Sequence, residues 1–423
     1  MLDSIGHDFQ GSLSQDDHIS YDRMRRRSSI YCELSVPPSS AEPSISKLED
    51  PPSVTFFYKI LELSCKAKII PFNWNATLRR FSSVGATDLW GHGLINLHSV
   101  IMYSVTIFSF FRLVTNVGKE RDAFPLMMKI VNVSWLLASI QISVIFLQNW
   151  FLRGDVMQYG NAILDKISIE GKFYDSKALW TGIVLLLLNP LPHGMVAMHT
   201  PCAPNLISSI VLNCSSIGDH DHAKFGVTKL LILGCWELYF MTVIFTVAFI
   251  TWAFVYLGVS LAAQEMNDMR LNDIPFEEGV PTYIELKRVT NLLNVAFKPY
   301  LSTFSIIIMA ICSILLFGSI RLWDVDFRAV TVFPFCAVRC GHETFSQILM
   351  TGQMRFASDR LKHYWAGRMQ GRGPWERKMF ACWSKSGVKV KAGIFFTFSR
   401  WVVIICVNNF IDQTLNLLVS VER

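Results

Sequence analysis

The sequence predicts an all-α membrane protein with seven transmembrane helices, the N-terminus inside, the C-terminus outside, and cytosolic helical extensions. Of the 423 residues, 51% are hydrophobic and 17% are charged, and the mean hydropathy is +0.34. Soluble domains average about 25% charged residues, so this composition excludes an ordinary soluble protein. The other two observations are a series of long apolar stretches and an uneven distribution of Lys and Arg along the chain.

A polar tail and an amphipathic segment precede the apolar stretches. Residues 1–52 are rich in Ser, Asp, Arg and Pro without apolar periodicity, so we expect a disordered cytosolic tail. Residues 53–93 are expected to hold a pre-membrane amphipathic helix, ending near Pro71, and a linker. Seven stretches then reach the ~20 residues that a bilayer requires. They are Leu94–Thr115, Met127–Leu147, Ala178–Met198, Leu230–Leu257, Leu301–Leu322, Ala329–Met350 and Ala392–Val421.

The long polar segments divide the remainder of the chain. Residues 94–352 are expected to contain the first six transmembrane helices, with a cytosolic extension over 258–300 that carries a helical apolar stripe. Residues 353–391, where aromatic and basic residues alternate, are expected to form a cytosolic anchor region. The last predicted helix occupies 392–423. Two interpretations of the extensions are open: they pack together or against a partner subunit, or they rest on anionic lipid.

The Lys and Arg residues predict the orientation. The segment before the first stretch and the connections two-to-three, four-to-five and six-to-seven carry 28 of them, and the other connections and the C-terminus carry seven. Because positively charged loops remain in the cytosol, the N-terminus is predicted inside and the C-terminus outside. This orientation is opposite to that of G-protein-coupled receptors.

The connection between the third and fourth stretches is therefore predicted to face outward. It contains the sequence Asn-Cys-Ser at 213–215, so Asn213 is the expected N-glycosylation site. Cys202 and Cys214 lie in the same connection and face an oxidising compartment, where they can form a disulfide. Neither CxxC pairs nor zinc-ligand spacings occur in the sequence, and no metal or cofactor is expected.

The last stretch carries strongly polar residues inside an apolar helix. At 100° per residue, one face of less than half the circumference collects all of them. They are Asn408, Asn409, Asp412, Gln413, Asn416 and Ser420. A carboxylate facing lipid costs at least ~2.5 kcal/mol, so Asp412 must face protein or water. Two interpretations are open: these six residues line a cation pore, or they hydrogen-bond other helices in a sealed bundle.

The C-terminal sequence resembles that of arthropod gustatory receptors. The resemblance is carried by AGIFFTFSR at 392–400 and by AVRCGHETFSQIL at 337–349, which looks like the end of that family's sixth span. In the terminal signature of the family, Thr-Tyr-(five apolar)-Gln-Phe, Thr414 matches the Thr. The other three positions differ, since they hold Leu415, Val421 and Glu422.

Membership of the gustatory and odorant receptor superfamily implies a chemosensory receptor in the plasma membrane. It further implies a homo- or hetero-tetrameric, non-selective cation channel that a small molecule opens, with membrane lipid around it and the last helix lining the pore. The three departures from the signature keep a second function open, a non-conducting receptor or scaffold of the same fold.

The resemblance also implies a ligand pocket in the outer half of the bundle. Aromatic and polar residues at that depth are the candidates, because a mostly apolar pocket with a few polar groups suits a small ligand. They are Trp135, His193, Trp236, Glu237, Tyr239 and Phe333. Packing alone also explains most aromatic residues in spans. No HExxH, GxSxG or paired intramembrane Asp occurs, so no enzyme is expected, and no nucleic-acid partner is expected.

Overall fold

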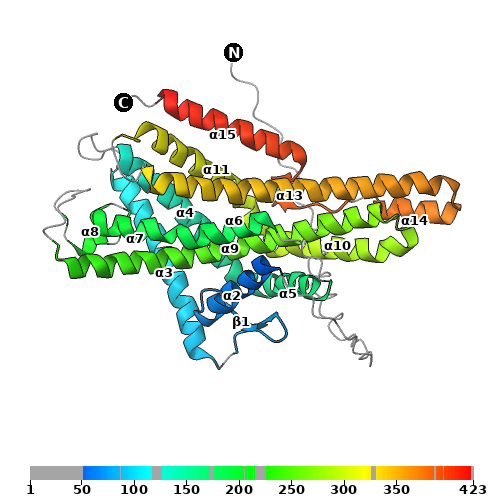
Figure 1. The fold of residues 1–423 in the computed structure, drawn as a ribbon, viewed down its shortest axis with the longest axis horizontal. Helices are drawn as coiled ribbons and strands as arrows, with labels where there is room; N and C mark the ends of the chain where they lie inside the picture. Colours follow the sequence, from blue (N-terminus) through cyan, green and yellow to red (C-terminus); the bar gives the residue numbers. More distant parts are fainter. Residues whose placement is uncertain are drawn as a thin grey trace, which may run out of the picture. The chain divides into compact units, whose positions relative to one another are not determined.

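The computed structural model describes residues 51–85, 87–116, 126–170, 176–203, 205–206, 208–212, 214, 225–324, 330–384, 387–393 and 395–420. Within these ranges the chain is helical apart from two short two-stranded hairpins, so the all-α prediction is confirmed (Figure 1). Residues Asp50–Arg423 form one compact unit. The predicted tail falls almost entirely outside the described residues, and so does Asn213.

The elements follow one another in a simple order. They are α2 (Pro52–Lys66), β1 (Phe72–Asn75), β2 (Arg80–Ser83), α3 (Leu89–Asn116), α4 (Leu126–Phe151), α5 (Arg153–Glu170), α6 (Lys177–Leu188), α7 (Pro190–His199), α8 (Ser208–Val211), α9 (Val227–Leu271), α10 (Phe276–Ala296), α11 (Lys298–Arg321), α13 (Val332–Arg368), η3 (Met369–Gly371), α14 (Pro374–Ser384), β3 (Lys391–Ala392), β4 (Phe396–Thr397) and α15 (Arg400–Ser420).

Among the described residues, six helical segments are long and apolar enough to cross a membrane. They are α3, α4, α6 together with α7, α9, α11 and α15. Most of the sixth predicted stretch, Ala329–Met350, lies in the first part of α13, from Val332 on. This helix is more polar but packs against both α9 and α11. The protein is therefore a multi-pass membrane protein with a seventh helix inside its bundle. The sides on which the termini lie remain a prediction.

The polar composition of α13 results from side chains that point into the bundle. Arg339, Glu343 and Gln347 are spaced at four-residue intervals and are all buried. Residues with this spacing share one face of a helix. The Tyr300 hydroxyl on α11 donates to the Gln347 side chain at 3.0 Å. These residues lower the hydropathy of the stretch, although their polar groups are bonded within the protein instead of to water.

The third predicted span is divided at a proline. α6 ends at Leu188 and α7 begins at Pro190, and the intervening Asn189 side chain donates to the Leu185 carbonyl at 2.8 Å. Proline lacks the N–H that would continue the helical bonds, and its ring clashes with the preceding turn. Asn189 keeps a helical backbone conformation, so α6 and α7 together form one span, and α7 packs along α9.

The cytosolic extensions predicted from the sequence pack against one another. α9 continues for 45 residues, and α10 packs back along it, toward α13 (Figure 1). The Trp365 indole donates to the Ile274 carbonyl at 3.1 Å, and its ring lies 5.4 Å from that of Phe276. Tyr283 bonds Ser358 at 3.0 Å. The extensions thus pack together as helices, while their place in the cytosol stays a prediction.

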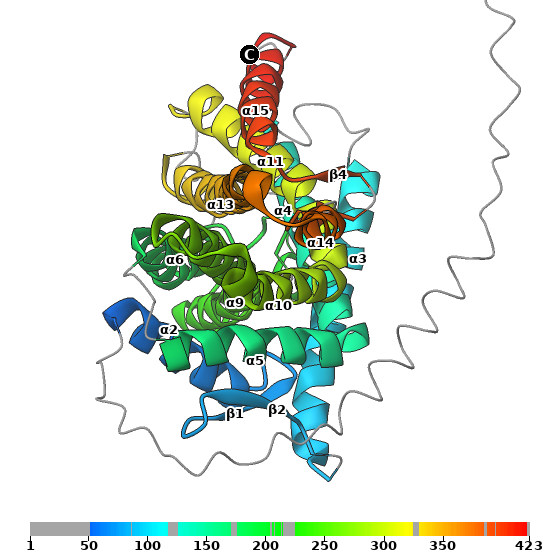
Figure 2. The ribbon, with the colours of Figure 1, turned by 90° about the vertical axis from the view of Figure 1, so that its right-hand side faces the viewer.

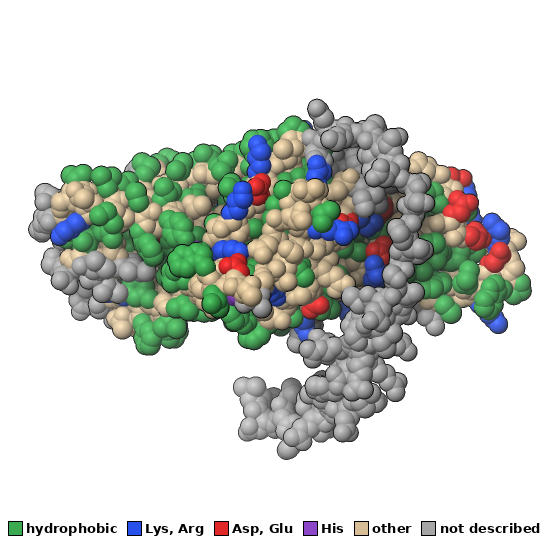
Figure 3. All heavy atoms as spheres, turned by 90° about the horizontal axis from the view of Figure 1, so that it is seen from below, with side chains coloured by type: hydrophobic (Ala, Val, Ile, Leu, Met, Phe, Trp, Pro, Cys, Tyr) green, Lys and Arg blue, Asp and Glu red, His purple; other side chains and the backbone are tan. Residues whose placement is uncertain are grey.

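The surface becomes more charged from the helical bundle toward the extensions. In Figure 3, hydrophobic side chains cover much of the left-hand part, while Lys, Arg, Asp and Glu gather in the middle and at the right-hand end. That end belongs to α10, α13 and α14 (Figure 1). An apolar bundle with charged residues beyond it is the distribution expected of helices that leave a bilayer.

The segment before the bundle contains a hairpin that the sequence did not predict. α2 ends at Lys66, before Pro71, and β1 pairs antiparallel with β2. The hairpin is held by α5: the Phe81 amide donates to the Asn161 side chain at 2.7 Å, and Arg80 binds Asp165 at 2.6 and 2.7 Å. The hairpin is held by residues some 80 positions further along the chain, and local sequence patterns cannot predict contacts over that separation.

The last helix begins eight residues later than predicted. Residues 392–399, expected to open the helix, instead contain β4 and a turn in which Gly393 has a φ of +56°, a backbone conformation suited to glycine. The Asn294 side chain of α10 accepts from the Lys391 amide at 2.8 Å and donates to the Lys389 carbonyl at 3.0 Å. The chain is thus fastened to the extension before α15 starts.

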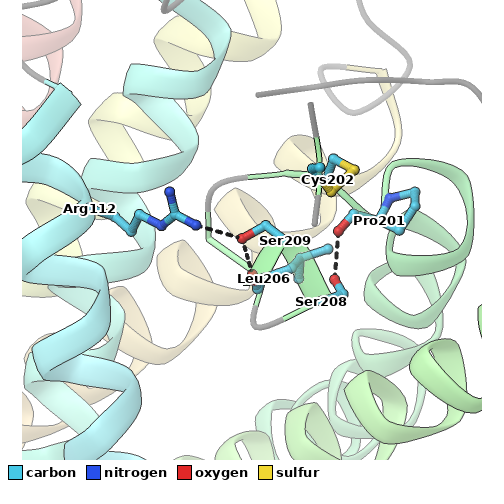
Figure 4. Close-up of a disulfide and its surroundings, with 7 residues drawn as sticks. Arg112, Pro201, Cys202, Leu206, Ser208 and Ser209 are labelled. Carbon is cyan, nitrogen blue, oxygen red and sulfur yellow. Dashed lines mark hydrogen bonds between the residues drawn. A yellow bond between two sulfur atoms is a disulfide. The ribbon is translucent and has the colours of Figure 1, made fainter. Parts of the chain in front are cut away.

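A disulfide joins Cys202 and Cys214, the two cysteines of the connection after α7 (Figure 4). Their Cα atoms are 5.8 Å apart. Beside it, Ser208 donates to the Pro201 carbonyl at 2.6 Å, and Arg112 of α3 donates to Ser209 at 3.1 Å. The bridge and these bonds hold the connection against the end of the bundle.

Replacing Cys202 by Ser is expected to lower the free energy of unfolding by about 2–4 kcal/mol, because the bridge restricts the unfolded chain. Thermal unfolding in mild detergent measures the effect, and Cys235→Ser is the control, since Cys235 is an exposed free thiol. Peptide mapping without reduction should yield a peptide pair linked through Cys202 and Cys214. Recovery of both cysteines as free thiols would contradict the assignment.

Candidate functional site

A cavity of about 130 Å³ lies inside the helical bundle. Its walls come from α4, α7, α9, α11 and α13, with Asn205 from the connection after α7. Most of the lining side chains are aliphatic or aromatic. Such a mostly apolar hollow with a few polar groups is the usual form of a small-molecule site.

Aromatic rings form one side of the cavity. The His193 ring lies 5.4 Å from Trp135 and 5.6 Å from Phe245, measured between ring centroids. His193 reaches this place because α7 starts after the break at Pro190 and packs along α9. Its Nε2 atom lies 3.5 Å from the Cys336 sulfur. The imidazole is thus held by both rings and a thiol.

A buried ion pair forms another part of the wall. Arg339 binds Glu343, one helical turn away on α13, with nitrogen–oxygen distances of 2.9 and 3.0 Å. Both side chains are less than one-tenth exposed. The guanidinium lies over the Phe245 ring at 4.1 Å and donates to the Phe245 carbonyl at 3.4 Å. The pair therefore brings opposite charges to the cavity that compensate each other.

Three polar side chains of the lining have buried atoms without a hydrogen-bond partner among the described residues. They are the Ser134 hydroxyl, the Asn205 carbonyl oxygen, and both the oxygen and the nitrogen of the Gln141 amide. Gln141 is 2% exposed. Buried polar groups without partners are rare in folded proteins. A polar group that entered the cavity would find hydrogen-bond partners in these atoms.

The structure brings three of the six predicted pocket residues together. Trp135, His193 and Phe333 line the cavity. Trp236 and Tyr239 border a second, much smaller hollow, where Tyr239 bonds His98 at 2.7 Å. The sixth, Glu237, is buried but lines neither hollow. Arg339, Glu343 and Gln141 were not predicted, although each is a polar residue in a transmembrane stretch and could have been selected for that reason.

The last helix, α15, differs from the other spanning helices in how little of it is covered. Only 11% of the residues in its most apolar 18-residue stretch are buried within the chain, against 33–72% in the other five spanning segments. α15 lies at the edge of the bundle, against α11 and α13 (Figures 1 and 2). Cys406 and Thr414 are its buried residues.

The six predicted pore residues are all on the uncovered side of α15. Asn408, Asn409, Asp412, Gln413, Asn416 and Ser420 are exposed in the single chain. Gln413 is at the edge of this face and accepts a hydrogen bond from Ser313 of α11 at 3.4 Å. The exposed side also carries an apolar strip that includes Ile411 and Leu415. An exposed helix of this kind can contact water with its polar strip and another subunit with its apolar strip.

No family model matches the sequence, and no curated protein matches it. Solved structures that are similar to the chain include two of one insect receptor. The insect olfactory receptor OR5 from Machilis hrabei has a TM-score of 0.56 at 11% identity, over 86% of this chain and 97% of that one. The same receptor in complex with eugenol has a TM-score of 0.59 at 9% identity, over 87% and 98%. The similarity shows that the chain has the fold of this receptor.

Proposed function

We propose that the chain is a subunit of a chemosensory receptor in the plasma membrane, a cation channel that a small molecule opens. The ligand binds in the cavity bordered by His193, Trp135 and Arg339. α15 lines the pore in an assembly of four identical or related subunits. The fold shared with an insect olfactory receptor, whose solved complex holds eugenol, supports a small-molecule ligand.

The observation that carries the proposal is the uncovered polar face of α15. In a single chain, Asp412 would meet lipid, at a cost of at least ~2.5 kcal/mol. Several copies around one axis remove this cost, because the polar strips then face a shared aqueous path and the apolar strips face neighbouring subunits. A ring of Asp412 carboxylates and amides in that path favours cations.

The helices that form the cavity also hold α15. α11 and α13 both line the cavity, and both pack against α15. Phe345 of α13 contacts Phe410 of α15 edge-on at 6.4 Å, and Ser313 of α11 donates to Gln413. Such shared helices let a ligand favour one arrangement of the pore helix, provided that it binds the two arrangements unequally.

The cytosolic extensions give the assembly a second contact region. Trp375 and Trp383 of α14 are exposed in the single chain, and large exposed aromatic residues favour association. With the N-terminus inside, this region lies in the cytosol. The bridged connection and Asn213 then face outward, where glycosylation takes place.

Particle images of the purified protein and currents of the reconstituted protein test the proposal together. We expect fourfold particles with a central helix from each subunit, and cation currents that an apolar odorant-like molecule evokes in liposomes. Fourfold particles without current under any ligand would favour the non-conducting receptor of the same fold. Monomeric particles would overturn the channel.

A further inference from the structure

Gln141 is the cavity residue whose side chain has both a donor nitrogen and an acceptor oxygen without a hydrogen-bond partner among the described residues. It lies near the middle of α4, is 2% exposed and lines the cavity. Neither its amide oxygen nor its amide nitrogen has a partner among the described residues. A buried polar group loses its bonds to water and regains stability only when a donor or acceptor reaches it. One ligand group that both donates and accepts can serve both atoms.

The charged residues of the cavity favour a neutral ligand group over a charged one. Arg339 and Glu343 are the oppositely charged residues of the lining, and they bind each other at 2.9 Å. A carboxylate or an ammonium group would have to replace one partner, which leaves the other charge buried and uncompensated. His193 is already in contact with the Cys336 sulfur. A neutral ligand leaves these pairs intact.

The volume limits the size of the ligand. The cavity measures about 130 Å³, and an apolar cavity of about 150 Å³ in another protein takes up benzene. The aromatic rings of Trp135, His193 and Phe245 favour offset or edge-on contact with a further ring. A compact molecule with about one aromatic ring therefore fits.

We propose that the cavity selects neutral, one-ring-sized apolar molecules that carry a hydroxyl, and that Gln141 is the residue that recognises the hydroxyl. The hydroxyl oxygen accepts a hydrogen bond from the amide N–H, and the hydroxyl donates a second hydrogen bond to the amide oxygen. This inference rests on the proposed function only in taking the cavity as a ligand site. An isosteric ligand without the hydroxyl leaves the amide unpaired and binds more weakly.

The test compares p-cresol with p-xylene, which differ by one hydroxyl in place of a methyl group. Binding to the full-length protein in nanodiscs is measured by calorimetry, with empty nanodiscs subtracted for partitioning into lipid. We expect the wild type to bind p-cresol at least about tenfold more tightly than p-xylene, equal to ~1.4 kcal/mol. In Gln141→Leu the ratio should fall by about tenfold.

Two variants serve as controls. Asn132→Leu changes an equally buried amide side chain of α4 outside the cavity lining, whose polar atoms also have no partner among the described residues, and its ratio should stay as in the wild type. Ser134→Ala tests the other unpaired polar group that α4 brings to the lining, and under the proposal it lowers the ratio less than Gln141→Leu does. Gln141→Met, which keeps an unbranched side chain, replaces Gln141→Leu if the leucine variant does not fold.

The outcomes separate this inference from the proposed function. Equal binding of both ligands to the wild type, or a ratio that Gln141→Leu and Gln141→Met leave unchanged, overturns the selection by Gln141 while the cavity remains a ligand site. A ratio lost in Ser134→Ala instead assigns the hydroxyl to Ser134 and overturns the role of Gln141. Absence of saturable binding by either ligand overturns the inference together with the ligand site.

Discussion

Replacing Glu343 by Gln is expected to lower the free energy of unfolding by about 3–5 kcal/mol, the usual effect of removing one partner of a buried ion pair. The substitution keeps the size of the side chain but leaves the Arg339 guanidinium, 6% exposed, without its counter-charge. The Phe245 ring at 4.1 Å compensates only a small part of this loss. Chemical unfolding in mild detergent, followed by tryptophan fluorescence, measures the effect.

An exposed ion pair on α10 offers a matched control for this prediction. Glu285 binds Arg288 one turn away on α10, at 2.9 Å, but the two side chains are 41% and 77% exposed. Glu285→Gln is therefore expected to change the free energy of unfolding by less than about 1 kcal/mol. The double variant Arg339→Met with Glu343→Leu should recover most of the lost stability, because no charge then stays buried. Equal effects of Glu343→Gln and Glu285→Gln would contradict the buried pair.

The sequence was sufficient for the elements whose signals are local. The apolar stretches predicted the spanning helices, because a bilayer imposes length and apolarity on each segment separately. α13 was the weakest of these predictions, since Arg339, Glu343 and Gln347 are polar in the sequence and acceptable in the bundle only through their partners. The hairpin around Phe81 was missed, because Asn161 and Asp165, which hold it, lie far along the chain.

For the cavity, too, the local sequence predicted one property and missed another: it predicted how deep a residue lies in the membrane, but not which way its side chain points. The candidate pocket residues were chosen for their predicted depth in the membrane, and Trp135, His193 and Phe333 meet in the cavity. Which face of a helix points inward depends on packing. Glu237 precedes the cavity residue Phe245 by eight positions on α9, which places it about 80° around the helix and about 12 Å along it. It is buried there, but away from the cavity.

Replacing Asp412 by Asn is expected to reduce the preference of the channel for cations over anions by about fivefold or more, if α15 lines the pore as proposed. A unit charge about 4 Å from a permeating ion in a water-like medium contributes about 1 kcal/mol, which equals about fivefold in the local concentration of that ion. Every subunit loses one such charge. The measurement is the reversal potential of ligand-evoked currents across a gradient of sodium chloride, which moves toward that of an unselective pore.

Thr414→Val is the matched control, because Thr414 lies two residues further along α15 but faces the bundle. Its side chain is 6% exposed, and its hydroxyl donates to the Phe410 carbonyl within the same helix at 2.8 Å. We therefore expect the reversal potential of this variant to equal that of the wild type. A sealed bundle predicts the opposite pattern for Asp412→Asn, a change in the surface level of the protein with ion selectivity unaffected. Asp412 is exposed in the single chain, whereas Thr414 is buried. The two variants therefore distinguish a water-filled pore lined by α15 from a sealed bundle of helices.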